Sequence, residues 1–205
     1  MFKFFNKIFT NLKEINFFPK IKMSSHDWDK YFEEVRKNCR DKRNCIMGNF
    51  SQKGFNYVFY ELIEHADRQL IFFIKDFESI FDDPKFRSLE MMCRKLNRLG
   101  GIIDVYTFNG KKDDRFINLE KEFKCFKYTP LSVNDENSIK KLSNFILADS
   151  NAYWLEESFT TFRRTNITND EEFFKACFNF GDYQKTYELY DYIRAVENII
   201  NQCKK

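Results

Sequence analysis

The chain has 205 residues, of which 43% are apolar and 32% charged, and its formal net charge is +3. This length and apolar content predict one globular domain with its own core. The near balance of charge excludes a strongly basic or acidic protein, so a surface for nucleic acid or an anionic membrane would need local clustering. Basic clusters, which can also be plain solvated surface, occur at Arg94-Lys95 with Arg98, Lys111-Lys112, Lys140-Lys141 and Arg163-Arg164.

The six cysteines are scattered, without a Cys-x-x-Cys pair and without a histidine at zinc-like spacing. We therefore expect free thiols, no metal site and no cofactor. No apolar run reaches the length of a membrane span, and Lys and Asn interrupt the apolar residues of the N-terminus, unlike a signal peptide. These features predict a soluble, cytoplasmic protein.

Residues 1–22 differ from the rest because phenylalanines alternate with lysines. On a helix ending near Pro19 they would form a basic amphipathic segment. Such a segment can dock on the protein's own core, lie on an anionic membrane surface or fill a groove of a partner. Translation from Met23 is a further alternative. The apolar face, a candidate membrane or partner contact, comprises Phe5, Ile8, Leu12 and Ile15 together with Met1.

A helical extension and linker are expected over residues 23–50. Helical periodicity covers Asp27–Cys39, and Asp41–Gly48 is polar and basic, as linkers are. The main domain would then comprise residues 51–205. The buried face of the extension helix would comprise Trp28, Tyr31, Phe32 and Val35.

From residue 51 onward, helical and strand patterns alternate. A helix is expected over Phe55–Ala66 and an apolar strand over Gln69–Ile74. Asp82-Asp83-Pro84 is typical of a helix start and Gly100-Gly101 of a helix end, because each suits the backbone conformation at that terminus. The next expected elements are a strand at Ile102–Phe108, a short helix at Leu119–Phe123, a strand at Cys125–Tyr128 and a helix or approach at Glu136–Leu142.

The segment from Asn144 to Glu157 carries the most distinctive pattern. Asn144–Ala148 has the composition of a buried strand, Asp149-Ser150-Asn151 that of a tight turn, and Ala152–Leu155 that of a second strand. We therefore expect a hairpin in which the Asp149 side chain bonds its own turn. A metal site is a weaker interpretation, because Glu156 and Glu157 point to opposite faces of a strand.

After the hairpin, a strand at Phe159–Arg164 and a turn at Asn166–Asp170 are expected. The alternation of helices and strands predicts an α/β fold, with a mixed β-sheet flanked by helices and an N-terminal helical appendage. A closing helix would follow Asn179–Asp182, and its apolar face would comprise Tyr187, Leu189, Tyr190, Ile193, Val196 and Ile200.

Residues 53–200 resemble the phospholipase D-like superfamily, in which a strand with a His-x-Lys signature runs into a turn aspartate and a second strand. With Asp149 at the turn aspartate, Leu142 stands at the nucleophilic His and Asn144 at the Lys. The resemblance implies a single half-unit that lacks the family's catalysis. Because active members with one copy place two subunits across a shared cleft, it also implies a homodimer.

Neither His26 nor His65 matches the signature strand, so no catalytic residue is assigned. A non-catalytic binding or scaffold module for a protein or nucleic-acid partner is expected. The alternatives are a phosphodiester-processing enzyme with a relocated site and a membrane-peripheral adaptor. One of Tyr153 and Trp154 would lie in the core, while the other would stack on a base or fill a partner pocket, and arginines would bind phosphate. The candidate binding residues are Asn144, Asp149, Trp154, Glu156, Arg163 and Arg164.

Overall fold

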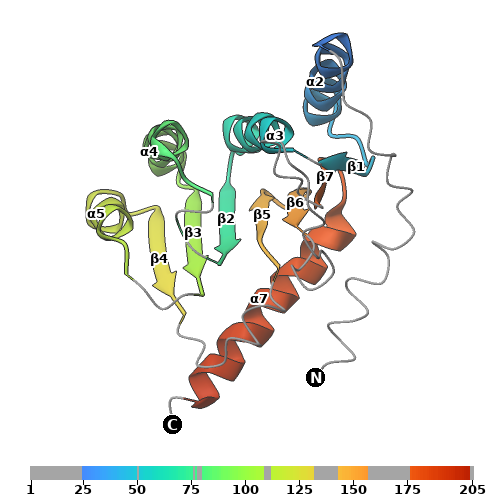
Figure 1. Ribbon diagram of the computed structural model, residues 1–205. Helices are drawn as coiled ribbons and strands as arrows, with labels where there is room; N and C mark the ends of the chain where they lie inside the picture. Colours follow the sequence, from blue (N-terminus) through green and yellow to red (C-terminus); the bar gives the residue numbers. More distant parts are fainter. Residues whose placement is uncertain are drawn as a thin grey trace, which may run out of the picture.

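A seven-stranded mixed sheet with helices on both faces forms the protein, which confirms the predicted α/β fold (Figure 1). The computed structural model describes residues 25–49, 51–75, 77, 80–108, 112–131, 143–156 and 176–203. The strands are β1 (Met47–Asn49), β2 (Gln69–Ile74), β3 (Ile102–Thr107), β4 (Phe126–Pro130), β5 (Phe145–Ala148), β6 (Ala152–Glu156) and β7 (Ala176–Asn179). The described helices are α2 (Ser25–Arg40), α3 (Gln52–His65), α4 (Asp83–Leu99), α5 (Asp114–Glu122) and α7 (Tyr183–Cys203).

The strand order is β1-β7-β6-β5-β2-β3-β4. The β2–β3 and β3–β4 pairs are parallel, since α4 and α5 cross over between them, and the other neighbours are antiparallel. The β2 strand lies between β3 and β5, and its residues from Leu70 to Ile74 are all buried. A continuous apolar run is what a strand covered on both faces requires.

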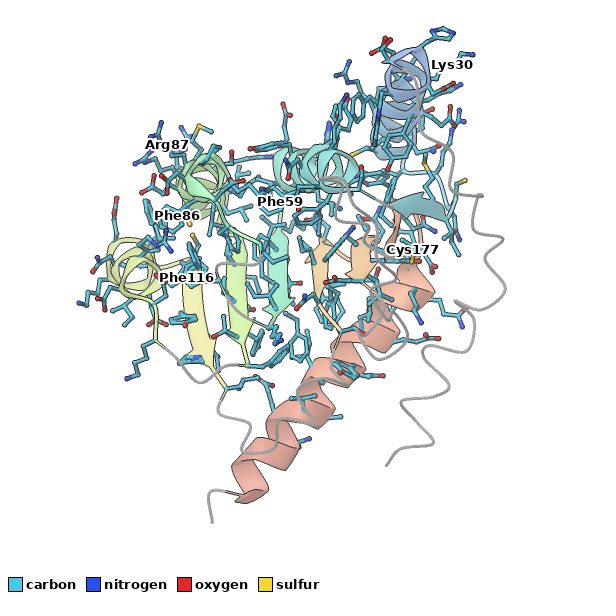
Figure 2. All side chains as sticks on the ribbon, viewed as in Figure 1. Lys30, Phe59, Phe86, Arg87, Phe116 and Cys177 are labelled. Carbon is cyan, nitrogen blue, oxygen red and sulfur yellow. The ribbon has the colours of Figure 1, made fainter. Side chains whose placement is uncertain are left out.

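Alternating side chains of the sheet enter two separate cores. Phe72 packs on the face covered by α3, α4 and α5, where its ring centroid lies 6.2 Å from that of Phe59. Phe73 points to the opposite face and packs against Tyr192 of α7 at 5.4 Å. Figure 1 shows α7 running diagonally past the sheet, apart from the other helices. In Figure 2, Phe86 and Phe116 mark the aromatic contact between α4 and α5.

Both ends of α4 follow the predicted signals. The Asp82 side chain accepts a hydrogen bond from the Lys85 amide at 2.9 Å and caps the first turn. Gly100 ends the helix in the left-handed conformation with φ of 71°, where a residue without Cβ is not strained. The expected α3 and β2 are also present, with small shifts in their bounds.

Several local predictions are wrong. The expected linker contains β1, whose Met47 pairs with Phe178 of β7. The helix expected at residues 119–123 begins at Asp114, because Asp113 caps it by accepting from the Arg115 amide at 2.9 Å. The first half of β4 fits the prediction, but β7 was not expected as a strand.

The helix faces also differ in part from the predictions. Tyr187 is 62% exposed, while Tyr192 is buried in its place on α7. On α2, Val35 is buried, but Trp28, Tyr31 and Phe32 are only half-buried. The elements expected at residues 136–142, 159–164 and 166–170 and the segment 1–22 lie outside the described residues. None of the described helices combines the length and apolar character needed to cross a bilayer.

Candidate functional site

The predicted hairpin is present. Strands β5 and β6 pair antiparallel, with Ile146 opposite Trp154 and Ala148 opposite Ala152. Asp149 begins the turn with φ of 51°, a left-handed conformation that Asp tolerates better than most residues. The turn therefore closes the strand pair as the sequence indicates.

The Asp149 carboxylate binds a different loop from the one that carries it. Its Oδ1 accepts from the amides of Arg68 at 2.8 Å and Gln69 at 3.0 Å, and its Oδ2 from the Asp67 amide at 3.2 Å. The Asp149 amide donates to the Gln69 carbonyl at 2.8 Å. The expectation that this side chain bonds its own turn is wrong, because the turn lies against the α3–β2 loop, whose amides face the carboxylate.

Helix α7 joins this contact through the hydroxyl of Tyr190. This hydroxyl donates to the side chain of Gln69 and lies 3.3 Å from the Asp149 carbonyl. Burial raises the pKa of Tyr190 to about 12, with the nearby Asp149 charge acting in the same direction. The hydrogen-bonding groups of the turn are thus used to join β5, β2 and α7.

Asn144 and Glu156 form a buried polar pair at the other end of the hairpin. The Asn144 Nδ2 donates to Glu156 Oε2 at 2.6 Å, and its Oδ1 accepts from the Lys75 amide at 2.6 Å. The exposed fractions are 8% for Asn144 and 6% for Glu156. Burial raises the pKa of the Glu156 carboxyl, although Asn144 and Lys75 act in the opposite direction. Asn144, at the position matched to the family lysine, therefore uses its amide to join the ends of β2, β5 and β6.

Neither aromatic residue of β6 is available for stacking on a ligand. Trp154 is 1% exposed and packs on Phe55 at 4.7 Å between ring centroids. Tyr153 is 2% exposed and lies in the core on the other face of the sheet. The expectation that one of the two faces outward is wrong, because helices cover both faces of β6. Outside the described residues lie Leu142, Glu157, Arg163, Arg164, Phe5, Ile8, Leu12 and Ile15.

Three metal-ligating side chains meet where α2 packs on α3. We call Cys39, Glu61 and His65 the Cys–Glu–His cluster; one donor atom from each lies within 4.8 Å of the others. His65 Nε2 is 3.3 Å from Glu61 Oε2, one helical turn away. Cys39 reaches the pair from the last turn of α2, and its Sγ lies 3.8 Å from the Glu61 carbonyl oxygen.

The three side chains of the cluster differ in their burial and in the charges around them. Burial raises the pKa of the Cys39 thiol to about 12, and the charges of Glu61 and Glu64 add to this while Lys42 opposes it. Cys39 and Glu61 are buried, whereas the His65 side chain is 47% exposed. The thiol and carboxylate are therefore shielded from bulk water, and the imidazole lies at the entrance.

A small pocket connects the cluster to the hairpin turn. All three cluster residues line it, together with Asp149 and Asn151 of the turn. Its cavity volume of about 20 Å³ suits one water molecule or a bound ion, but no organic substrate. The pocket therefore offers space for ligation chemistry and none for an extended ligand.

The fold is similar to that of an archaeal chromatin protein. This protein, TrmBL2, is described as having a novel mode of DNA binding; the TM-score is 0.54 at 9% identity, and the match covers 84% of this chain and 66% of that one. The present chain thus spans slightly less than two thirds of its relative, and at this identity the likeness shows the fold alone.

A phosphatidylserine synthase from Haemophilus influenzae Rd KW20 gives a TM-score of 0.41 at 12% identity, over 77% of this chain and 38% of that one. No protein-family model and no curated protein matches the sequence.

The cluster escaped the sequence prediction because its members are distant along the chain. Cys39 and His65 lie on different helices, so no fixed ligand spacing connects them. The available signal was the spacing of Glu61 and His65, which puts both side chains on one face of a helix. Only the packing of α2 on α3 supplies the thiol.

Proposed function

We propose that this protein is a non-catalytic binding module of phospholipase D-like type that engages nucleic acid. The observation that carries the proposal is a row of exposed arginines on the outer face of α4. We call this row, Arg87, Arg94 and Arg98, the arginine stripe. Met91, 61% exposed, lies between the first two arginines on the same face.

The helix geometry aligns these side chains. Positions 87, 91, 94 and 98 recur every three or four residues, so they project from one face over about 16 Å. Figure 2 shows Arg87 on the side of α4 away from the sheet. The helix carries five basic and two acidic residues, and Glu90 flanks the stripe. The charge of this face is therefore positive on balance.

The arginine stripe keeps its charges available. Lys95, on the flank of α4, is paired with Asp67 at 3.1 Å. By contrast, no carboxylate of the described residues lies within ion-pair distance of Arg87, Arg94 or Arg98. Guanidinium groups bind phosphate oxygens through paired N–H donors, and an exposed methionine offers apolar contact to sugars. A row of this kind suits a phosphodiester backbone.

The state of the hairpin supports a role without catalysis. The Asp149 carboxylate accepts three backbone amides, and the Glu156 carboxylate is held by Asn144. Phosphodiester transfer by the active family needs an imidazole nucleophile and a cation for the phosphate charge, and Asn144 supplies neither. The similar chromatin protein binds DNA according to its description, which makes DNA the first ligand to test.

Fluorescence anisotropy with labelled single-stranded and duplex oligonucleotides tests the proposal across a salt series. Affinity should fall as salt rises, because each bound phosphate releases counterions. The double substitution Arg94→Ala and Arg98→Ala should reduce the magnitude of the slope of log K against log salt by about 2 for duplex DNA. The Arg163→Ala and Arg164→Ala pair, expected from the sequence to contact phosphate, belongs in the same series.

A matched control is available on α2. Lys30, labelled in Figure 2, and Lys37 are both exposed and lie two turns apart on this helix. The double substitution Lys30→Ala and Lys37→Ala therefore removes the same charge elsewhere. This control should leave the salt slope near the wild-type value. Equal losses of affinity in both double variants would show that binding depends on overall charge and not on the position of the arginine stripe. Absence of salt-dependent binding would refute the nucleic-acid proposal and favour a protein partner.

A further inference from the structure

We propose that Cys39, Glu61 and His65 form a zinc site that ties the end of α2 to α3. The site is distinct from the arginine stripe and from the hairpin hydrogen bonds. Its three ligands come from two helices, and the fourth position is left for water. Its occupation would fix the helical extension to the body of the protein.

The donor positions approach those of a tetrahedral metal site. Two nitrogen or oxygen ligands at about 2.1 Å from zinc are about 3.4 Å apart. The His65 Nε2 and Glu61 Oε2 separation of 3.3 Å already agrees with this. The Sγ of Cys39 is within 4.8 Å of both donors, so a side-chain adjustment of about 1 Å brings it into the zinc–sulfur range.

The ligand set selects a borderline-soft divalent ion. One thiolate, one carboxylate and one imidazole combine donors found in protein zinc sites, whereas calcium and magnesium prefer oxygen alone. The thiolate and carboxylate together carry two negative charges, which balance Zn²⁺ in a buried position. On binding, the Cys39 thiol loses its proton to solvent and the Sγ–Zn bond forms, with no change of oxidation state.

The contacts that compete with the metal are weak. Arg36 Nε lies 3.7 Å from Glu61 Oε1, and the Arg36 side chain is 67% exposed, so it can turn into solvent. The Sγ of Cys39 holds only a long contact of 3.8 Å to a carbonyl. Lys42 lines the pocket as well and disfavours a cation, but it too is exposed. The alternative is an ordinary His–Glu pair beside a core thiol, which would bind no metal.

Cobalt titration of the full chain tests the site, because Co²⁺ replaces Zn²⁺ and gives visible absorption. We expect one equivalent to produce tetrahedral d–d bands with a thiolate-to-cobalt charge-transfer band, and Zn²⁺ to abolish both. Cys39→Ser should remove the charge-transfer band. Glu61→Gln and His65→Asn should each weaken binding by at least the roughly 10- to 100-fold cost of losing an outer-shell partner.

The chain offers matched controls for both side-chain types. Cys45 and His26 are exposed and lie outside the cluster, so Cys45→Ser and His26→Asn should leave the cobalt spectrum unchanged. Thermal unfolding gives a second readout, in which stoichiometric zinc should raise the Tm of wild type and not that of His65→Asn. Because His65 is half-exposed, this variant folds without repacking the core.

Two results would overturn the proposal. One is wild-type protein that shows no thiolate–cobalt band with cobalt in excess. The other is a charge-transfer band that survives Cys39→Ser or disappears with Cys45→Ser. Neither readout involves nucleic acid, so failure here leaves the arginine stripe untouched.

Discussion

The hairpin turn and the Cys–Glu–His cluster line the same pocket, yet their polar groups are used in opposite ways. In the turn, the Asp149 carboxylate accepts three amides and its own amide donates to Gln69. In the cluster, Cys39, Glu61 and His65 face one another with long or solvent-exposed contacts. The difference teaches which polar groups are available to a ligand. A group that already holds good hydrogen bonds must give them up to bind a ligand, whereas a group with weak contacts binds one at little cost.

The largest expected effect comes from breaking the turn. Asp149→Ala removes the acceptor of three amides and places a residue without a polar side chain at φ of 51°. We expect the free energy of unfolding to fall by about 2–4 kcal/mol, as judged by urea denaturation. Asp149→Asn keeps an acceptor and tolerates the conformation, so it should lose less than half as much. Equal losses would assign the effect to the charge or the second oxygen of the carboxylate, both of which Asn lacks.

A second prediction concerns Gly181, which packs closely against the chain between α2 and β1. A Cβ at Gly181 would lie 2.6 Å from backbone atoms of Arg43 and Asn44, the chain that leads from α2 to β1. Gly181→Ala should therefore cost about 1–3 kcal/mol through overpacking. Thermal unfolding measures it. Gly100→Ala is a contrasting variant, because its Cβ meets open space and its strain comes from φ alone.

The buried carboxyl of the hairpin gives a pH-dependent test. Burial raises the pKa of Glu156 in the folded protein above its ordinary 4.5. At a pH between the unfolded and the folded pKa, the folded protein therefore keeps a proton that the unfolded chain has lost. Wild-type stability attributable to this group is thus present at low pH and is lost as the pH rises through that interval. Glu156→Gln keeps a hydrogen-bond acceptor and carries no such proton.

The advantage of Glu156→Gln over wild type in unfolding free energy should therefore grow from about pH 4 toward neutrality and then level off. Urea denaturation at a series of pH values measures the difference. A constant difference across the series would show that Glu156 titrates normally in the fold. Asp83→Asn, at the exposed start of α4, is a control for general charge effects.

The smallest effect is expected in the cluster without metal. His65→Asn removes one half-exposed partner of an i,i+4 pair, which contributes about 0.2–0.5 kcal/mol. In the presence of a chelator, its unfolding curve should nearly superimpose on that of wild type. A loss as large as that of Asp149→Ala would mean that the cluster is structural like the turn, and the contrast between them would disappear.

Elements with strong local signals could be predicted from the sequence. Strand β2 is a continuous apolar run, and α4 has an aspartate cap at one end and a glycine in the left-handed conformation at the other. These signals arise within a few residues, so they act wherever the chain is placed. The short strands β1 and β7 lack them, since three or four residues carry little periodicity and depend on pairing with each other.

The polar sites show the same limit more sharply. The sequence identifies Asp149 as a turn residue, but its true partners are the amides of residues 67–69, which only the packing of two loops brings near. The sequence predicts that one of Tyr153 and Trp154 faces outward, because β6 could have had one open face, such as the one that Trp154 occupies. Helix α3 covers that face through Phe55. Contacts between distant segments decide both cases, and one sequence does not contain them explicitly.

The β1–β7 pair has a consequence for synthesis on the ribosome. Met47 pairs with Phe178, so 131 positions separate the partners. At about 5–20 residues per second, β1 emerges on the order of ten seconds before the strand that it needs. During this interval, α2 can pack on α3, but β1 lacks its neighbouring strand, and this end of the sheet is complete only when β7 arrives. The order of translation thus makes this sheet edge the last to form and the one most exposed to chaperones and proteases.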